Sequence, residues 1–487
     1  MTAWALALLL TTVPLVDAVK QHDADAVRAL LRQKMDVNAP EGDGATALHW
    51  AAYGDHADLV DLLLAAGARV NVANDLSITP LYLASANGNA AIVSALLARG
   101  ATADAASETG VTPLMEAARG GHAAVVRVLL QHGADPNVRE GERDQTALMW
   151  AAARGRTDVV TALLDHGATI HARSRVRAVT VMLDQGPRRA VKTSAADAKQ
   201  IDAGGRTALL FAAQEGHAAV VSRLLAAGAD KDDRAADGNT ALVVAALSGH
   251  RSAAQVLIDA GANPDTAGAG YSALHASVLR GDLATVQALL RRGANPNVAL
   301  TNGSPVRRFG AQWALPRTLM GTTPLAVAAI YLELDIMRAL LAAGADVSLG
   351  LVDGTTPLLA AAGAAVEKEV RPSDLERWNV VNIDQPIIPR AETDVLAATA
   401  LLLDAGAGVN HVSLSGDTAL HAAAGAGLTT VIRLLVERGA TLDLVNRDGQ
   451  TPLSLTLPGP LLADGRPSPR PGLKAAEELL RKLGATR

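Results

Sequence analysis

Residues 112–138 read TPLMEAARGGHAAVVRVLLQHGADPNV, and this stretch decides the fold. After its opening Thr-Pro-Leu come small residues, and after Gly121-His122 comes a more aliphatic segment with the i, i+3, i+4 apolar spacing of a half-buried helix. Thr112 can cap the first helix, which Pro113 starts without needing a backbone N–H partner. Gly133 follows the second helix, where glycine accepts the left-handed conformation without a Cβ penalty. The stretch predicts two short helices joined by a tight turn.

The same phrase returns along the whole chain. Its anchor residue stands at Thr46, Thr79, Thr112, Thr146, Thr207, Thr240, Ser272, Thr323, Thr356, Thr418 and Thr451. The successive gaps are 33, 33, 34, 61, 33, 32, 51, 33, 62 and 33 residues, so seven of ten lie within one residue of 33. Ordering 33 residues costs roughly 50 kcal/mol at about 1.5 per residue, which one thin helix pair cannot offset. We therefore predict an open stack in which each repeat packs on its neighbours.

Four pieces of the phrase, Thr112-Pro113-Leu114, Thr46-Ala47-Leu48-His49, Gly121-His122 and the sequence GADPNV at 133–138, resemble the ankyrin-repeat family. The resemblance covers about residues 15–456 in eleven registered copies. It implies an all-α solenoid of about 11–12 helix-turn-helix repeats with β-hairpin-like finger loops. The bias toward Ala, Gly, Leu and Arg is typical of a bacterial multi-repeat ankyrin protein.

Composition narrows the classes of function. The chain is 49% hydrophobic but 2% aromatic, so its core must consist mainly of Ala, Leu and Val. A net charge of −5 gives no reason to expect nucleic acid or an acidic membrane as partner. The absence of cysteine excludes thiol nucleophiles, disulfides and thiolate metal sites. Since the sequence has no P-loop, nucleophile elbow, zincin helix or dinucleotide-binding glycine pattern, we expect no enzyme, cofactor or metal.

The N-terminus carries an apolar run. Residues 4–16 are apolar apart from two threonines, which is the length of a signal-peptide core and too short for a bilayer span of about 20 residues. Val16 and Ala18 supply small residues for a cleavage site, so residues 1–18 are a candidate signal peptide and the protein is expected to be periplasmic or secreted. No Lys or Arg precedes the run, which leaves two alternatives: a cytoplasmic chain whose apolar first helix caps the stack, or a start codon further upstream.

The repeat array is assigned to residues 19–456, and three gaps exceed the period by about 28, 18 and 29 residues. They place insertions near 172–203, 299–321 and 364–394, and insertions into solenoids often line the binding face. The first is basic, and its residues 176–181, followed by a turn signal at 184–187, predict a short hairpin. Residues 457–487 are expected to form a Pro- and Gly-rich linker and a C-terminal capping helix over Leu473–Leu483.

The resemblance implies a non-enzymatic scaffold that binds a protein partner on its concave face, through its finger tips and the ends of its first helices. The residues that map there are Tyr53, Arg119, Arg154, Gln214, Glu215, Arg280 and Tyr331. Tyr and Arg are frequent interface anchors. The alternative is a receptor for an anionic or carbohydrate ligand, for which the insertions offer Arg188, Arg189, Arg307, Arg308 and Trp313. No nucleic acid and no transmembrane span are expected.

Other residues that recur at fixed positions of the phrase have structural explanations. The resemblance makes His49, His275 and His421 hydrogen-bonding residues within and between repeats, and it places further histidines in the turn between helices. Histidines one repeat apart cannot share a metal ion. Trp50 and Trp150 align with the core leucine position of the family, so both are expected to pack in the interior.

Overall fold

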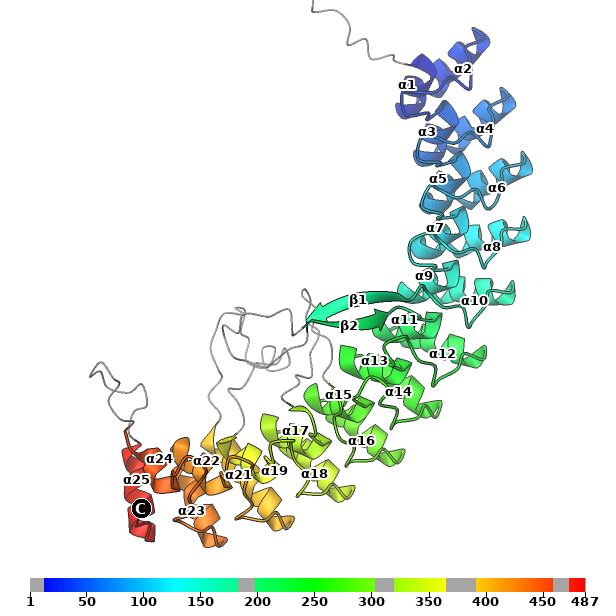
Figure 1. Ribbon diagram of the computed structural model, residues 1–487. Helices are drawn as coiled ribbons and strands as arrows, with labels where there is room; N and C mark the ends of the chain where they lie inside the picture. Colours follow the sequence, from blue (N-terminus) through cyan, green and yellow to red (C-terminus); the bar gives the residue numbers. More distant parts are fainter. Residues whose placement is uncertain (1–12, 183–197, 303–318, 365–390, 459–472, 487) are drawn as a thin grey trace, which may run out of the picture. The chain divides into compact units, whose positions relative to one another are not determined.

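The computed structural model describes residues 13–182, 198–302, 319–364, 391–458 and 473–486 (Figure 1). The chain divides into two compact units, Met1–Arg177 with Ala203–Ala236, and Ala178–Asp202 with Asp237–Arg487. Both units consist of antiparallel helix pairs. In every pair except the first, the first helix starts just after an anchor residue. The second helix follows a tight turn except in the pairs that end with α21 and α25, where a longer segment precedes it.

The first unit holds six pairs among its described residues. They are α1 (Pro14–Lys20) and α2 (Ala24–Arg32), α3 (Ala47–Tyr53) and α4 (Ala57–Ala65), α5 (Pro80–Asn87) and α6 (Ala90–Ala98), α7 (Pro113–Gly120) and α8 (Ala123–Gln131), α9 (Ala147–Ala153) and α10 (Thr157–Asp165), and α11 (Ala208–Gln214) and α12 (Ala218–Ala226). First helices contact first helices of adjacent repeats, and second helices contact second helices. The first helices of this unit therefore form one face and the second helices the other (Figure 1).

The second unit continues the same plan with six more pairs in the part that the structure describes. They are α13 (Ala241–Ser248) and α14 (Arg251–Asp259), α15 (Ala273–Leu279) and α16 (Leu283–Arg291), α17 (Pro324–Tyr331) and α18 (Leu334–Ala342), α19 (Pro357–Leu359) with the π-helical turn η3 (Ala360–Ala364) and α21 (Glu392–Asp404), α22 (Ala419–Gly425) and α23 (Thr429–Glu437), and α24 (Pro452–Thr456) and α25 (Lys474–Leu483). Twelve pairs agree with the predicted 11–12 repeats.

A two-stranded sheet interrupts the helices. It pairs β1 (Arg177–Met182) with β2 (Ala198–Ala203). The strand predicted at 176–181 is therefore present, whereas the predicted turn at 184–187 lies outside the described residues. The predicted hairpin required a second strand but did not place it, because AKQIDA at 198–203 has a single β-branched residue and no apolar alternation.

Most anchor residues act as helix caps, and Thr207, whose hydroxyl accepts no capping hydrogen bond, is an exception. The Thr112 hydroxyl accepts a hydrogen bond from the Met115 N–H at 3.3 Å, and Pro113 occupies the first helical position. At the other end of the pair, Gly133 has φ +86°, and its N–H continues the hydrogen bonding of α8 to the Leu130 carbonyl. This left-handed conformation ends the second helix and turns the chain toward the next finger. Glycine occupies the position because a residue with a Cβ would be strained there.

Polar side chains join each repeat to the next. In the second repeat, Nδ1 of His49 lies 3.0 Å from both the backbone nitrogen and the hydroxyl of Thr46, and Nε2 lies 3.0 Å from the carbonyl of Ile78 in the following repeat. His275 and His421 make the same pair of contacts, reaching the carbonyls of Thr322 and Gln450. The structural role predicted for these three histidines is confirmed.

The fingers are also joined, by one backbone hydrogen bond between neighbours. In the first unit these bonds run from Asp75 N to Asp43 O (2.9 Å), Glu108 N to Leu76 O (3.3 Å), Gly141 N to Thr109 O (2.8 Å) and Arg175 N to Arg143 O (2.7 Å). Gly110 shows how close the fingers approach, because a Cβ on it would lie 2.9 Å from the Gly141 nitrogen. We call this series the finger ladder.

The N-terminal apolar run ends in the first repeat. Leu15, Val16 and Val19 of α1 are almost completely buried, and Ala18 is 7% exposed. A cut after Ala18 would therefore remove most of the buried face of α1. Residues 1–12 lie outside the described part of the chain.

The buried histidines make stability depend on pH. Complete burial lowers the pKa of His275 to about 4, against an ordinary value of 6.5, and burial likewise lowers the pKa of His49 and His421. Between these values the unfolded chain binds more protons than the folded one, so the free energy of unfolding falls as pH drops from 6.5 toward 4. The full difference for His275 corresponds to about 3 kcal/mol.

We predict that His275→Gln lowers the urea midpoint at pH 7.5, because the bond to the Thr322 carbonyl is weakened, yet makes the midpoint fall less steeply than in the wild type between pH 6.5 and 4.5. Urea titrations followed by circular dichroism at four pH values in this range measure both effects. Parallel curves for the two proteins would show that the His275 ring does not titrate with a lowered pKa.

Candidate partner-binding face

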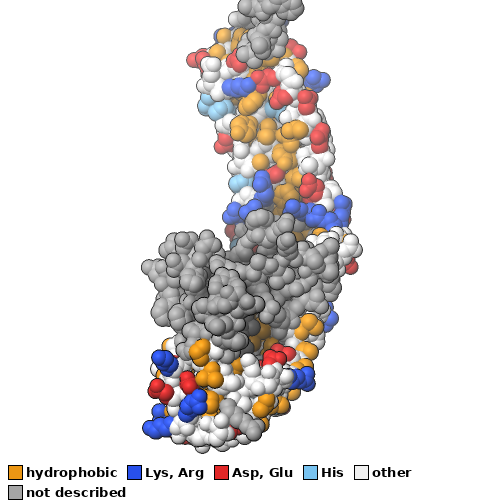
Figure 2. Space-filling view, turned by 60° about the vertical axis from the view of Figure 1, so that its left-hand side comes forward, with side chains coloured by type: hydrophobic (Ala, Val, Ile, Leu, Met, Phe, Trp, Pro, Cys, Tyr) orange, Lys and Arg blue, Asp and Glu red, His pale blue; other side chains and the backbone are white. Residues whose placement is uncertain are grey.

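The first helices of the first unit carry a row of large side chains. The residue four positions after each anchor is Trp50, Leu83, Glu116, Trp150 and Phe211 in successive repeats, and we call these five residues the first-helix row. All are half-buried except Glu116, which is 8% exposed. Since α3, α5, α7, α9 and α11 contact one another in order, the row runs along one face. Figure 2 shows a band of hydrophobic side chains bordered by charged ones on this unit.

At its N-terminal end the row is held by charged groups. Lys20 Nζ lies 4.1 Å from the centre of the Trp50 ring and 2.6 Å from the Glu41 carboxylate. The Trp50 indole N–H donates to the other oxygen of Glu41 at 2.6 Å. Tyr53 packs edge-on against Trp50, with ring centres 5.8 Å apart, yet stays 60% exposed. These contacts fix an aromatic pair whose outer ring remains available.

A groove lies beside this pair, between the fingers and first helices of the second and third repeats. Its volume is about 240 Å³. Trp50, Tyr53, Ile78 and Leu83 give it an apolar wall, while its polar lining includes Asp43, Asn74 and His49. An apolar recess with a few polar groups at its edge is suited to one large side chain of a partner.

The middle of the row holds an ion pair whose carboxylate, that of Glu116, is nearly buried. The Glu116 carboxylate accepts the Tyr82 hydroxyl at 2.9 Å and the Arg119 guanidinium at 3.0 and 2.5 Å. Burial, followed by the negative charge of Glu116, raises the pKa of the Tyr82 hydroxyl. Arg119 is therefore oriented along the face, and its side chain is still 52% exposed. Sequence reasoning selected Arg119 but missed Glu116 and Tyr82, whose only signal was polar character in a first helix.

Aromatic residues are concentrated on this face. The chain has eleven in all, and the structure describes seven of them. Five lie on first helices of the first unit: Trp50, Tyr53, Tyr82, Trp150 and Phe211. None of the five is fully enclosed, whereas Tyr271 in the second unit is 1% exposed. Although the chain has few aromatic residues, most of the seven that the structure describes contact solvent on this face.

The predicted packing role of Trp50 and Trp150 was wrong in one respect. Both rings are half-buried on the first-helix face, and the Trp150 indole N–H donates to the Gln145 side chain of its own finger at 2.9 Å. The interior behind them is filled by the residues on either side, such as Met149 and Ala151, which are at most 1% exposed. In the first unit the corresponding position of the repeat mostly borders the core rather than filling it.

The other predicted site residues fall into three groups. Arg154 and Glu215 are exposed at the ends of α9 and α11, and Gln214 donates to Glu215 at 2.9 Å. Arg280 and Tyr331 are half-buried in the second unit, where the Arg280 guanidinium donates to the Leu247 carbonyl at 2.8 Å and burial lowers its pKa to about 10. The candidates from the insertions, Arg188, Arg189, Arg307, Arg308 and Trp313, lie outside the described residues.

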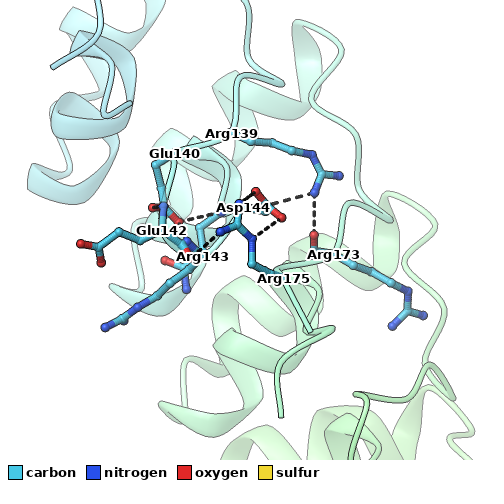
Figure 3. A network of polar contacts seen from close by, with 8 residues as sticks. Arg139, Glu140, Glu142, Arg143, Asp144, Arg173 and Arg175 are labelled. Carbon is cyan, nitrogen blue, oxygen red and sulfur yellow. Dashed lines mark hydrogen bonds and ion pairs between the residues drawn. The ribbon is translucent and has the colours of Figure 1, made fainter. Parts of the chain in front are cut away.

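At the base of the basic insertion, cations are already bound to the fingers (Figure 3). Arg175 makes two bonds to the Asp144 carboxylate, at 2.9 and 2.7 Å, and one to the Glu142 carbonyl. Arg173 pairs with Asp233 and donates to the carbonyls of Gly205 and Arg234. These two arginines stabilise finger-to-finger contacts, so they contribute less to an anion site than the sequence implied.

The same finger is organised by a buried carboxylate. Glu140 is 5% exposed and accepts the backbone N–H groups of Glu142, Arg143 and Gln145 at 2.7–3.0 Å. Arg139, next to it, donates to the Arg173 carbonyl at 2.7 Å. The fifth finger thus has a fixed shape before any partner binds.

Two other kinds of feature are absent from the described ranges. No group of three or more His, Asp or Glu residues there is placed to hold a metal ion. No helix in those ranges is long and apolar enough to cross a membrane.

Fold and face together define a helical-repeat scaffold with a continuous side-chain row. The family model described as "Ankyrin repeats (3 copies)" matches residues 11–74, 81–174, 175–268, 236–300 and 391–456. These matches span well over half of the chain. The protein belongs to the ankyrin-repeat family.

Curated relatives share only part of their length with it. The chain is 32% identical over 142 residues to the B-cell lymphoma 3 protein homolog of Mus musculus, covering 27% of this chain and 32% of the relative. It is 30% identical over 167 residues to the human B-cell lymphoma 3 protein, covering 32% and 37%. The match to neurogenic locus notch homolog protein 1 of Xenopus tropicalis is 36% identical over 152 residues, covering 30% of this chain and 6% of that protein. The chain therefore spans about a third or less of these relatives.

Among solved structures, the human ASB11 ankyrin repeat domain is 28% identical with a TM-score of 0.42. The alignment covers 52% of this chain and all of that domain.

We predict that Glu140→Ala lowers the free energy of unfolding of the first unit by about 1–3 kcal/mol, because three finger N–H groups lose a charged acceptor. Glu140→Gln keeps one acceptor oxygen and should cost less. Thermal denaturation measures stability, and hydrogen exchange at residues 141–145 should speed up. Unchanged exchange in Glu140→Ala would show that the carboxylate does not hold the finger.

Proposed function

We propose that this protein is a non-enzymatic scaffold that binds a protein partner on the concave face formed by the first helices and fingers of its first unit. Ankyrin repeats are generally protein–protein interaction modules, which supports the class of function. One observation supports the location: five aromatic side chains of an aromatic-poor chain lie partly exposed on this face.

Two properties of the face favour binding energy concentrated in a few residues. Tyr53 and the finger residue Leu76 are 60% and 61% exposed, although both are large and apolar. Trp50 and Arg119 are held by their neighbours, so binding costs little side-chain ordering. Tyr, Trp and Arg in this arrangement are typical of interface hot spots.

The same position in the second unit is built differently. Four residues after the anchor stand Val244, Ala276, Val327 and Ala360, which are 0–9% exposed, and Ala422 and Leu455, which are half-buried; none of the six is aromatic or charged. Small enclosed side chains give a partner little area to contact. The first unit is therefore the proposed main binding surface.

Export remains our proposal for localisation, supported by the apolar run at residues 4–16. The burial of Leu15 and Val16 in α1 favours a mature chain that still contains Pro14–Lys20. N-terminal sequencing of the native protein, recovered from separated cell fractions, tests both points. A mature chain beginning at Val19 would contradict the retention of α1.

We predict that Tyr53→Ala with Trp150→Ala lowers affinity for the native partner by about 10–100-fold, since hot-spot truncations typically cost 2 kcal/mol or more. The matched control is Val352→Ala with Leu414→Ala, which removes apolar side chains 71% and 56% exposed in the second unit. Circular dichroism checks that both variants fold.

The partner itself is identified by photo-crosslinking in the source cells. A photoreactive residue at Tyr53 should yield a discrete protein adduct, and the same residue at Asp61, exposed on α4, should not. Equal adducts from both positions, or an affinity unchanged by the double substitution, would place the binding surface elsewhere.

A further inference from the structure

Three exposed carboxylates stand beside the first-helix row. Asp43, Asp75 and Glu108 lie on the consecutive fingers of the second, third and fourth repeats, three or four residues before each anchor. Asp43 accepts the Ala45 N–H of its own finger at 2.9 Å. None of the three forms an ion pair with a cationic side chain in the described part of the chain.

The finger ladder fixes the positions of these acids. The Asp75 N–H donates to the Asp43 carbonyl, and the Glu108 N–H donates to the Leu76 carbonyl. The three carboxylates are therefore attached to adjacent, mutually bonded fingers rather than to independent loops. Their spacing follows the repeat, as does the spacing of the row beside them.

Two cations of the same face are already engaged, whereas Arg154 at the end of α9 forms no ion pair with a described residue. Lys20 pairs with Glu41 and lies over Trp50, and Arg119 pairs with Glu116. Each of these pairs is neutral as a whole, so the three finger-tip acids give this edge a net negative charge. An apolar band with an acidic border complements a partner that is apolar in its centre and basic along one side.

We propose that the occupant of this face is a polypeptide segment in which Lys or Arg side chains accompany large apolar ones. The apolar side chains contact Trp50, Tyr53 and Leu83 and enter the 240 Å³ groove, while the cations meet Asp43, Asp75 and Glu108. This inference rests on the proposed function, because it gives the chemistry of the partner for that same face.

The size of the face limits the length of the segment. Packed neighbouring helices lie about 8–10 Å apart, so the row from Trp50 to Trp150 extends over about 24–30 Å in three steps. An extended segment of about 8–9 residues or a helix of about 16–20 residues covers that distance. Anionic polymers and anionic membranes do not fit, because unpaired carboxylates would repel them.

The test selects random sixteen-residue peptides displayed on phage against the full-length protein at low salt. We expect the selected peptides to be enriched in Lys or Arg together with Trp, Phe or Leu, and their binding to weaken as salt rises from 50 to 300 mM. Replacing either the basic or the apolar residues of a selected peptide by Ser should lower its affinity about tenfold or more.

Two charge-reversal variants separate site from overall charge. Asp75→Lys with Glu108→Lys should weaken the selected peptides at least tenfold. Asp61→Lys with Asp158→Lys changes the net charge equally on exposed second-helix positions and should change affinity less than threefold.

The possible outcomes test this inference separately from the proposed function on which it rests. One outcome is that the selected peptides carry no basic residues, bind Asp75→Lys with Glu108→Lys as well as the wild type, and still lose binding to Tyr53→Ala with Trp150→Ala. This outcome would contradict a basic partner and would leave the proposed protein-binding face unchanged. Peptides insensitive to the aromatic substitutions would overturn the face itself. If the two charge-reversal variants lower the peptide affinity equally, the peptides are attracted by the overall charge of the protein, and the inference of contacts at Asp75 and Glu108 is wrong.

Discussion

Every repeat of this protein depends on the one that follows, because a single helix pair leaves half of its apolar surface uncovered. Leu59, Val60 and Leu63 of α4 are completely buried only because α2 and α6 pack on either side. Hydrogen bonds across the same boundary, such as that from His49 to the Ile78 carbonyl, require the neighbour to be in register. The repeated phrase thus determines both the fold of one repeat and its packing on the next. The residues of the phrase are therefore buried or hydrogen-bonded within the stack.

What the phrase does not constrain is available for binding. The position four residues after each anchor borders the core, so it accepts Trp50, Leu83 or Glu116 in the first unit and Ala276 or Val327 in the second. Alanine there is enclosed by its neighbours, whereas tryptophan must extend toward the fingers. The same backbone therefore gives a continuous contact surface in the first unit and an enclosed position in four repeats of the second.

Much of the fold could be predicted from the sequence because its signals are local. Caps such as Thr112, terminators such as Gly133 and the apolar spacing of each second helix act within a few residues. The candidate site was harder to predict from the sequence, since several of its contacts join side chains on different repeats. That Tyr82 donates to Glu116, or that Arg175 is bound by Asp144, depends on residues about one period apart whose side-chain directions no local rule determines. Trp50 and Trp150 were misplaced by alignment because the position they occupy is half enclosed in the first unit, although it is fully enclosed where it holds Ala276 or Val327.

The finger ladder gives this surface a physical advantage. Loops that carry a binding site usually lose conformational freedom when a partner docks, and this loss reduces the affinity. Here each finger already donates a backbone N–H to its neighbour, and Glu140 closes the fifth finger with three more such bonds. The acids at the tips of the second to fourth fingers and the row beside them are consequently ordered before binding. Affinity on such a face is set by the match of side chains to the partner, which is why a few substitutions in the repeats can redirect it without disturbing the stack.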